Sequence, residues 1–487
     1  MTTTPADPWE PGRRLEASLL PDRRRATGAW YTPPALAAEV AGRALDACEA
    51  PLPLVCDPAC GGGAFLLAAA EHLAARGHER AAVVRRLVAM DLSPEAVAAT
   101  AEALERWCGG EATPVVAVGD ALVDPWPAVP DVVVGNPPFL GQLSSATART
   151  PARAAALRAR WGEAASGYVD DAALFLLAAC RAVRPGGSVG LLQAESVLAT
   201  RSAAGVRAEV APGLRRVDLH GDRWFDAGVR VCSVVVAPGR GGEIPLVRGD
   251  RWSPLVATAR GVPDVARPDG PPLGSVARVW AGFRDEFYGL APLVGESAGH
   301  RVITGGLVDP ASSRWGEVPA RIGGRRWATP AVDPARLPAW ATSLLRPKLL
   351  VATQTRVVEA VADPGGTWVP ITPVVSVIPE GAGPGLLHLL AVLLAPPVSA
   401  WAMTATAGSA LSGDALKVSA GLVRDLPLPS AGADWDEAAA LVGEAGVAAG
   451  AGERGRCLDA AGAAMCRAYG VDADPVLGWW SARRPRR

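Results

Sequence analysis

The chain has 487 residues, a length that predicts two or three domains. Its net charge of −1 lacks the overall basic signature of many nucleic-acid-binding proteins, although local basic patches matter more than the sum. No run of eighteen apolar residues occurs, and the first 25 residues contain no apolar core of a signal peptide, so we expect no membrane association and a cytoplasmic location.

The eight cysteines predict neither a disulfide framework nor a metal site. None of them forms a C-x-x-C pair, and no cluster has the spacing of zinc ligands. Cys56 and Cys60, in "CDPAC", are interpreted as free thiols, which suits a reducing compartment.

Changes in composition along the chain predict four parts. Residues 1–25 are rich in proline and arginine and predict a flexible N-terminal arm. Residues 26–240 alternate short apolar runs with helical segments, which predicts an α/β domain with a sheet covered by helices on both faces. Residues 241–430 contain shorter strands and many prolines and predict a mixed α+β domain, and residues 431–487 predict a short helical tail.

Within the α/β domain, four successive predicted strands each deliver a polar side chain at the carboxyl end. "PLVCD" ends at Asp57, "RLVAMD" at Asp91, "PVVAVGD" at Asp120 and "DVVVGN" at Asn136. Ligands of open α/β sheets bind at this edge. A single aspartate there is more often a helix cap, but four in register predict a binding site.

The segment "DPACGGGAF", from Asp57 to Phe65, lies between a predicted strand and a predicted helix. Its glycines allow close approach of the backbone to a ligand, and the start of the helix offers free N–H groups. Such turns also occur in folds that bind nothing there, and the segment does not match G-x-G-x-x-G. Asp91, at the end of the next strand, lies where doubly wound sheets hold a ribose diol.

Asn136 begins the segment "NPPF", in which two prolines exclude a helix or strand interior. "DPACGGGAF" followed by "GNPPF" resembles the AdoMet-dependent amino-methyltransferases of DNA, in particular the N6-adenine enzymes of restriction–modification systems. "TGAWYTPPALAAEV", "VAVGDAL" and "RWFDAGVRVCSVVV" resemble further motifs of this family. Their order, with the cofactor motif first, the catalytic motif second and target recognition last, resembles the gamma class.

The resemblance implies AdoMet as the cofactor and an AdoMet-dependent methyltransferase fold of the Rossmann-like type. It implies that Asp91 binds the ribose hydroxyls and Asp120 the adenine amino group of the cofactor. Gly62 stands where the family has a small polar residue, a departure from which we expect little consequence. The implied cofactor-binding residues are Tyr31, Thr32, Pro33, Asp57, Pro58, Ala59, Cys60, Gly61, Gly63, Phe65, Asp91, Asp120 and Ala121.

The resemblance also implies the residues that act on the target base. Asn136 and the carbonyl of Pro137 would accept hydrogen bonds from the target amine, and Phe139 would stack on the base with Phe225 as a second aromatic wall. A core role remains the alternative for both phenylalanines. The implied catalytic residues are Asn136, Pro137, Pro138 and Phe139.

Residues 241–430 resemble, more weakly, the target-recognition domains of these enzymes, which implies double-stranded DNA as the partner. Each arginine there is as well explained by a solvated surface as by a DNA contact, and the tryptophans Trp280, Trp315, Trp327 and Trp340 are better explained as core than as base-stacking residues. The candidate DNA-binding residues are Arg284, Arg325, Arg326, Arg346, Lys348, Thr353, Gln354, Thr355 and Arg356.

Three alternatives to a DNA adenine methyltransferase stay open. An AdoMet-dependent methyltransferase of RNA adenine or of protein glutamine shares the N-P-P core, but enzymes of that kind are usually shorter and lack the upstream Y-T-P-P. A non-catalytic AdoMet-binding subunit is disfavoured by the intact "NPPF". A fused nuclease is disfavoured because the chain holds only two lysines, Lys348 and Lys417, so we expect cleavage to come from a separate restriction endonuclease or defence-system subunit.

Overall fold

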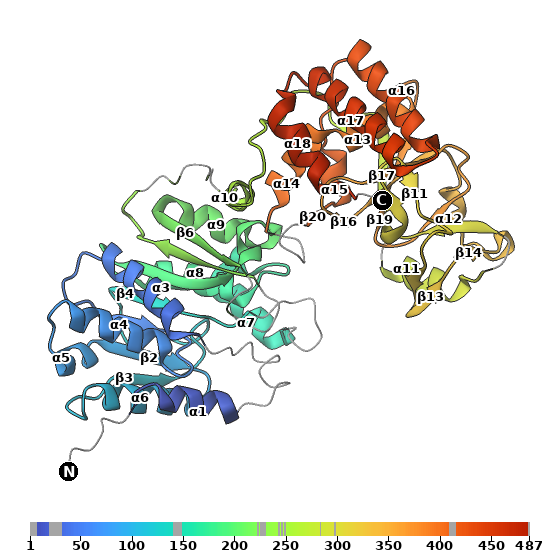
Figure 1. The fold of residues 1–487 in the computed structure, drawn as a ribbon. Coiled ribbons are helices and arrows are strands. Elements are labelled where there is room, and N and C mark those ends of the chain that lie inside the picture. Colours follow the sequence, from blue (N-terminus) through green and yellow to red (C-terminus); the bar gives the residue numbers. More distant parts are fainter. Residues whose placement is uncertain are drawn as a thin grey trace. The chain divides into compact units, whose positions relative to one another are not determined.

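The computed structural model describes residues 7–18, 32–139, 149–221, 224, 230–241, 244, 247, 250–282, 284–296, 299–408 and 415–485. Its contacts divide the chain into two compact units, Met1–Val256 and Ala257–Arg487 (Figure 1). The first unit contains a seven-stranded sheet, and the second contains several small sheets and a set of C-terminal helices.

The sheet of the first unit has the strand order β3-β2-β1-β4-β5-β7-β6. Its first five members run parallel, and β7 is antiparallel to both β5 and β6. Three of the four predicted polar strand ends belong to the neighbouring strands β2, β1 and β4. The strands are β1 (Val55–Asp57), β2 (Leu87–Asp91), β3 (Val115–Val118), β4 (Val132–Gly135), β5 (Ser188–Ala194), β6 (Leu214–Gly221) and β7 (Val231–Val236).

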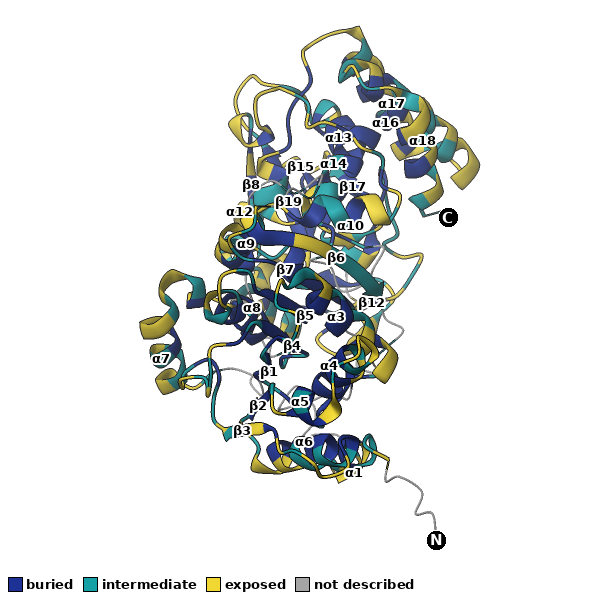
Figure 2. Ribbon diagram, turned by 90° about the vertical axis from the view of Figure 1, so that its left-hand side faces the viewer, coloured by how far each residue is buried: buried dark blue, intermediate teal, exposed yellow. Residues whose placement is uncertain are grey.

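Helices cover both faces of this sheet, so the predicted α/β fold class is confirmed. Figure 2 shows the helices α3 and α4 on one side of the strands and α7 and α8 on the other. β1, β4 and β7 are buried along their whole length, which explains why they are continuous apolar runs. The helices are α1 (Glu10–Ser18), α3 (Pro34–Ala47), α4 (Ala64–Ala75), α5 (Arg80–Val84), α6 (Pro94–Trp107), α7 (Pro151–Trp161), α8 (Asp171–Ala182), α9 (Ala204–Val210) and α10 (Ser253–Ala259).

Local sequence signals explain where the helices next to the site begin. Ser93 caps α6 by accepting a hydrogen bond from the backbone N–H of Ala96 at 3.1 Å, and Pro94 is the first helical residue. α4 begins directly after Gly63, whose φ of 83° favours glycine.

The prediction of a flexible arm at residues 1–25 is wrong for residues 10–18, which form the ordered helix α1. Arg14 of α1 donates to Glu102 of α6 at 2.5 Å, and Arg106 of α6 donates to Glu10 at 2.8 Å. The acidic and basic partners of α1 lie about ninety residues later in the chain, so the sequence of the arm alone gives no sign of them. Residues 1–6 and 19–25 lie outside the described part of the chain.

The second unit contains several small sheets, which confirms the predicted mixed α+β character. Its largest sheet has the order β17-β15-β19-β8 with antiparallel pairs throughout, and β14, β9 and β18 form a second sheet. The strands are β8 (Ala277–Ala281), β9 (His300–Ile303), β10 (Val308–Asp309), β11 (Ser312–Ser313), β12 (Ala320–Ile322), β13 (Arg325–Trp327), β14 (Ala331–Val332), β15 (Lys348–Ala352), β16 (Gln354–Thr355), β17 (Ala360–Asp363), β18 (Val369–Pro370), β19 (Val374–Pro379) and β20 (Leu416–Lys417).

The helices of the second unit are concentrated toward the end of the chain, as predicted for the tail. The last three lie within residues 431–487, and the exact domain boundaries stay predictions. The helices are α11 (Arg284–Leu290), α12 (Ala339–Ser343), α13 (Leu386–Leu394), α14 (Pro396–Thr406), α15 (Ala420–Arg424), α16 (Ala433–Val447), α17 (Ala451–Ala468) and α18 (Ala473–Arg483).

In the part of the chain that the structure describes, no single helix combines the length and the apolar character needed to cross a membrane. α13 and α14 meet that requirement only as a pair, with a bend of 57° between them. Most residues of both helices are buried within the second unit, so this pair is weak evidence for a membrane segment.

Candidate functional site

The candidate site begins at the carboxyl end of β1, where Asp57 packs against the end of β4. The Asp57 side chain is 1% exposed, and its Oδ1 accepts a hydrogen bond from the backbone N–H of Ala59 at 3.0 Å. A Cβ atom at Gly135 would lie only 2.7 Å from Asp57 Oδ1. Glycine at position 135 therefore allows the carboxyl group to lie directly beside the strand that leads into Asn136.

The glycine loop between β1 and α4 is held from two sides. The backbone N–H of Gly61 donates to Asp91 Oδ2 at 2.9 Å, and the hydroxyl of Thr100 on α6 donates to the Gly61 carbonyl at 3.0 Å. Gly61 has a φ of 51°, and a Cβ atom there would meet no atom within 4 Å. The loop thus presents backbone to open space, next to the first turn of a helix, an arrangement suited to a polar ligand.

Thr100 was not predicted as a site residue. It is fully buried, and a Cβ atom on Gly63 would lie 3.2 Å from its hydroxyl oxygen. The sequence feature that could have identified Thr100 is its position on the apolar face of the predicted helix. It lies three residues after Val97 and four before Leu104, which is helical spacing.

Burial changes the acidity of two carboxyl groups at this edge. It raises the pKa of Asp57 to about 8; the hydrogen bond from Ala59 opposes this change, and the nearby Asp91 adds to it. Burial also raises the pKa of Asp91, against the hydrogen bonds from the backbone of Ser93 and Gly61. Because ionised carboxylates are costly here, a cationic ligand group would be stabilised at this place.

Asp120 lies two residues beyond the end of β3 and is tied to a helix that follows the "NPPF" segment. Its Oδ1 accepts from the backbone N–H of Leu122 at 3.1 Å, and its Oδ2 accepts from Arg153 of α7. Arg153 also donates to Asp171 at 3.0 Å, and Asp171 accepts from Arg149 at 2.8 Å. Arg153 was not predicted as a site residue, because a lone arginine outside the recognised motifs is indistinguishable from a surface residue.

Asn136 follows β4. Of its two side-chain polar atoms, only Nδ2 has a hydrogen-bond partner among the described residues. Its Nδ2 donates to the hydroxyl of Thr32 at 3.1 Å, so the "YTPP" and "NPPF" segments meet although 104 residues separate these two side chains. Asn136 Oδ1 is buried and has no hydrogen-bond partner among the described residues. A buried acceptor without a partner costs about 1–3 kcal/mol of stability. Such an acceptor is therefore typical of a site where a ligand supplies the missing hydrogen bond.

The structure brings most of the predicted cofactor-binding residues together at this edge. Thr32 is buried beside Asn136, and Pro33 immediately precedes α3. Gly61 is half-buried, whereas Pro58, Cys60, Gly63, Phe65 and Ala121 are buried. Tyr31 lies outside the described residues.

The predicted base-contacting residues are placed in part. Pro137 is buried, Pro138 is half-buried, and Phe139 is half-buried against the core that α3 and α4 share with β1 and β4. The core alternative for Phe139 therefore stays open. Phe225 lies outside the described residues.

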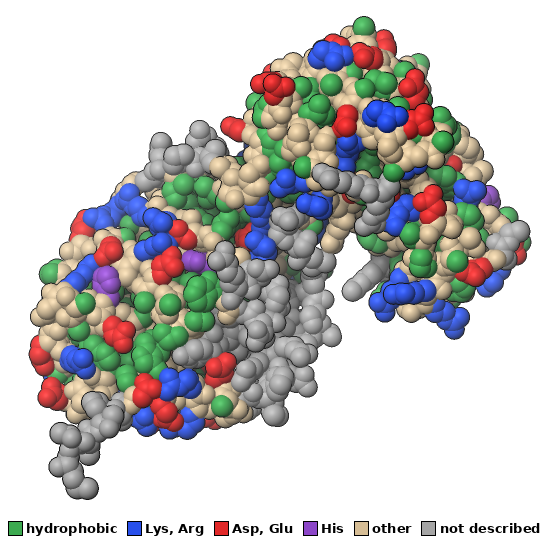
Figure 3. All heavy atoms as spheres, viewed as in Figure 1, with side chains coloured by type: hydrophobic (Ala, Val, Ile, Leu, Met, Phe, Trp, Pro, Cys, Tyr) green, Lys and Arg blue, Asp and Glu red, His purple; other side chains and the backbone are tan. Residues whose placement is uncertain are grey.

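Most predicted DNA-binding residues of the second unit are exposed. Arg325 and Arg326 lie on β13, and Figure 3 shows basic side chains gathered where Figure 1 labels that strand. Arg346, Gln354 and Arg356 are exposed, whereas the side chain of Arg284 lies outside the described part.

The prediction that Lys348 contacts DNA is wrong. Lys348 is 0% exposed, and its Nζ donates to Asp363 Oδ2 at 2.6 Å. Burial lowers the pKa of Lys348, against the attraction of Asp363. Asp363 also accepts from the backbone N–H groups of Thr367 and Trp368, so the pair anchors a turn inside the second unit.

The four tryptophans Trp280, Trp315, Trp327 and Trp340 are half-buried, so a core role for them stays a prediction. Trp315 and Trp327 pack against the buried residues around β9 and β15, and Trp280 stacks on Trp340 with ring centroids 5.7 Å apart. Within the described ranges, no group of three or more His, Cys, Asp or Glu side chains could hold a metal ion.

The sequence of the first unit matches a known protein family. Residues 19–210 match the family described as N-6 DNA Methylase, a range that includes Asp57, Asp91, Asp120 and Asn136. This part of the chain is similar to an N-6 DNA methylase domain. Its seven-stranded, mostly parallel sheet is typical of the AdoMet-dependent methyltransferase fold. No curated protein sequence matches the chain.

Solved structures resemble the chain at low sequence identity. The cryo-EM structure of a DrdV–DNA complex is 12% identical, with a TM-score of 0.54 over 90% of this chain and 60% of that chain. The type IIG restriction endonuclease BpuSI is 11% identical, with a TM-score of 0.42 over 94% of this chain and 66% of that one. A modification subunit of a putative type I restriction enzyme from Vibrio vulnificus is 18% identical, with a TM-score of 0.36 over 48% and 52%.

The likeness to DrdV extends the shared fold beyond the N-6 DNA methylase domain into the second unit. The chain spans between 52% and 66% of the length of these three solved proteins.

Proposed function

We propose that the protein is a site-specific DNA methyltransferase that transfers a methyl group from AdoMet to the N6 amine of a flipped-out adenine in duplex DNA. We assign it to the gamma class, because the cofactor segment precedes the "NPPF" segment and the second unit follows both. The observation that carries the proposal is the buried Asn136 Oδ1 after β4, which has no hydrogen-bond partner among the described residues, in a region that matches N-6 DNA methylases.

The chemistry needs an acceptor of this kind. The lone pair of an adenine amine is delocalised into the ring, so the amine is a poor nucleophile. Asn136 Oδ1, together with the carbonyl of Pro137, would accept the two N–H hydrogens and favour a tetrahedral nitrogen whose lone pair points toward the methyl group. Positioning and electrostatics then supply most of the acceleration. Thr32 keeps the amide in this orientation by accepting from Nδ2.

The residues at the sheet edge suit AdoMet, which would supply an activated methyl group on a positively charged sulfur. Asp57 and Asp91 form an acidic environment that favours a cationic methionine group, and the Gly61 backbone faces open space. Asp91 has acceptor capacity beyond its two backbone hydrogen bonds and would bind the ribose hydroxyls. Asp120 would accept from the adenine amino group, with Arg153 holding its carboxylate in place.

The target base has to leave the helix to reach Asn136. Unstacking and unpairing one base costs a few kcal/mol, and an aromatic platform offsets part of this cost. We assign that platform to Phe139, which lies three residues after Asn136, and to Phe225 as the second wall.

Double-stranded DNA is the proposed partner of the second unit. The exposed Arg325, Arg326, Arg346 and Arg356, with Gln354, supply groups for phosphate and base contacts. The DrdV structure, which shares the fold, contains DNA. We propose further that the enzyme is a cytoplasmic modification component that works with a separate restriction endonuclease or defence-system subunit.

Methyl transfer from labelled AdoMet to mixed-sequence duplex DNA tests the proposal. We expect incorporation into DNA, with N6-methyladenine as the only modified nucleoside after enzymatic digestion. Label that enters only RNA or a protein glutamine would support the alternative enzyme class, and label in none of these substrates would contradict a catalytic role.

A further inference from the structure

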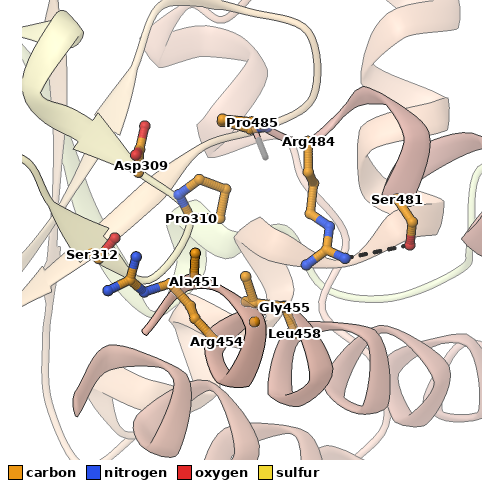
Figure 4. A pocket seen from close by; sticks show the side chains of 11 residues that line it. Asp309, Pro310, Ser312, Ala451, Arg454, Gly455, Leu458, Ser481, Arg484 and Pro485 are labelled. Atoms are coloured by element: carbon orange, nitrogen blue, oxygen red, sulfur yellow. Dashed lines mark hydrogen bonds between the residues drawn. The ribbon is translucent and has the colours of Figure 1, made fainter. Parts of the chain in front are cut away.

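The second unit contains a cavity that the proposed methyl transfer does not use. Its volume is about 290 Å³, and its walls come from the β10–β11 hairpin, the first turns of α17 and the end of α18. Figure 4 shows that Arg454 extends from α17 toward Ser312, while the guanidinium of Arg484 enters from the opposite wall. We call this cavity the arginine pocket.

The two arginines of the pocket keep unsatisfied donors. The Arg454 Nε and Arg484 Nε atoms are both buried and have no hydrogen-bond partner among the described residues. The Arg484 side chain is 9% exposed, and its Nη2 donates to Asp459 and, at 3.5 Å, to Ser481. Asp459 therefore binds Arg484 through Nη2, while Nε has no partner among the described residues.

A second cavity shares the wall formed by Asp309 and Arg484 and extends the positive surface. It has a volume of about 630 Å³ and adds Arg314, Arg356 and Arg483 to the lining. Asp309 lies 3.7 Å from Arg314, so this acidic group is already paired. The exposed Arg356 faces the same cavity and was predicted from the sequence as a DNA contact.

Guanidinium donors that lack a partner in the described part of the chain and lie on facing walls suit an oxyanion with several acceptor oxygens. A guanidinium group matches phosphate geometry with two parallel hydrogen bonds. The pocket also lies beside the first turn of α17, an 18-residue helix whose N-terminal N–H groups favour negative charge.

We propose that the arginine pocket binds a phosphate group of the DNA backbone. The inference that the bound phosphate belongs to DNA rests on the proposed function. The inference that the pocket binds phosphate rests only on the residues of the pocket. Because such a contact positions the duplex without reading a base, it would strengthen binding to all sequences alike.

Two pairs of variants isolate the pocket. Arg454→Gln removes a lining charge, and Arg456→Gln is its matched control, because Arg456 is exposed on the same helix and lines neither cavity. Gly455→Glu places a carboxylate on the lining, and Gly455→Gln has nearly the same size without the charge. A Cβ atom at Gly455 would meet nothing within 4 Å, so both helix substitutions leave the packing intact.

The first test measures the affinity of each variant for duplex DNA by fluorescence anisotropy over a range of salt concentrations. Arg454→Gln and Gly455→Glu should weaken binding to all duplexes equally and lower the slope of log affinity against log salt by about 0.9, the value for one phosphate contact. Arg456→Gln should match the unmodified chain, and Gly455→Gln should weaken binding less than Gly455→Glu, because it adds nearly the same bulk without the charge. Unchanged affinity and slope in both pocket variants would overturn the proposal of a DNA phosphate.

Calorimetric titration with inorganic pyrophosphate separates failure of the pocket from failure of the proposed function. Suppose that the unmodified chain binds AdoMet but no duplex. If it then binds pyrophosphate, and Arg454→Gln abolishes this binding whereas Arg456→Gln retains it, the pocket binds free phosphate. That result would overturn DNA as the source of the phosphate. Absence of pyrophosphate binding together with normal DNA binding by both pocket variants would overturn the pocket itself.

Discussion

Asn136 is the residue on which the proposed chemistry depends. Its amide nitrogen is held by Thr32, and its oxygen is buried without a partner among the described residues. A purely structural asparagine would use both groups, since leaving one unsatisfied costs stability. The combination therefore favours a residue that is kept ready for a ligand.

Replacement of this amide should separate binding from transfer. We expect Asn136→Ala to lower the rate of methyl transfer by at least about 100-fold, by analogy with the loss of a group that stabilises developing charge. AdoMet affinity, measured by calorimetry, should change little because the glycine loop and Asp91 are intact. Loss of AdoMet binding in this variant would show that Asn136 belongs to the cofactor site instead.

Asp57 gives a prediction about pH. Its pKa is about 8 in the folded chain against an ordinary aspartate value of 3.8, so the folded state binds the proton more tightly than the unfolded state. The contribution of Asp57 to stability is therefore present at low pH and is lost as the pH rises from about 4 to about 8. The Asp57→Asn variant does not lose this stability as the pH rises, because its amide does not ionise.

Urea unfolding of the cofactor-free chain at several pH values measures this effect. The stability of Asp57→Asn relative to the unmodified chain should increase with pH, approaching roughly 1.4 kcal/mol per unit within this window. The comparison removes the effects of other titrating groups such as His220, whose pKa is lowered by burial. A difference that is constant with pH would mean that Asp57 is ionised in the folded chain.

At the scale of elements, α1 and the glycine loop are in unusually close contact. A Cβ atom on Gly12 would lie 2.8 Å from the Gly62 carbonyl oxygen, and one on Gly62 would lie 2.6 Å from the Gly12 Cα. Glycine at both positions thus lets a helix backbone rest on the loop that forms part of the proposed AdoMet site.

A side chain at this contact should disturb the loop. We expect Gly12→Val to cost about 1–3 kcal/mol of stability, the range for overpacking, and to weaken AdoMet binding in equilibrium titrations. Ala17→Val is the matched control, because Ala17 is exposed on the same helix. Equal AdoMet affinity in the two variants would show that α1 does not support the loop.

The sequence predicted those elements whose signals are local. The apolar runs that end at Asp57, Asp91 and Asn136 are strands of one sheet, because buried parallel strands have to be apolar. β6 was not predicted because it is a partly exposed strand with charged residues along it. The burial of Lys348 and the pairing of Arg153 with Asp120 were not predictable, since both depend on partners brought close only by folding.

The two units of the molecule are proposed to bind different partners, the first AdoMet and the second duplex DNA. The proposed AdoMet-binding residues all lie before Val256, as do the residues proposed to hold the target base, and the candidate duplex-binding residues lie after it. We expect a chain shortened to residues 1–256 to bind AdoMet with normal affinity and to lose salt-sensitive binding to duplex DNA. Retention of full DNA affinity by the shortened chain would contradict a recognition role for the second unit.

Asn136 is proposed to direct methyl transfer to adenine N6 in DNA. Single-molecule sequencing of DNA from cells that express the unmodified chain or Asn136→Ala tests it most directly, because it reports the modified base and its sequence context together. We expect N6-methyladenine at one recurrent sequence in the first sample and none in the second. Absence of modified adenine from both samples, or the same pattern in both, would contradict it.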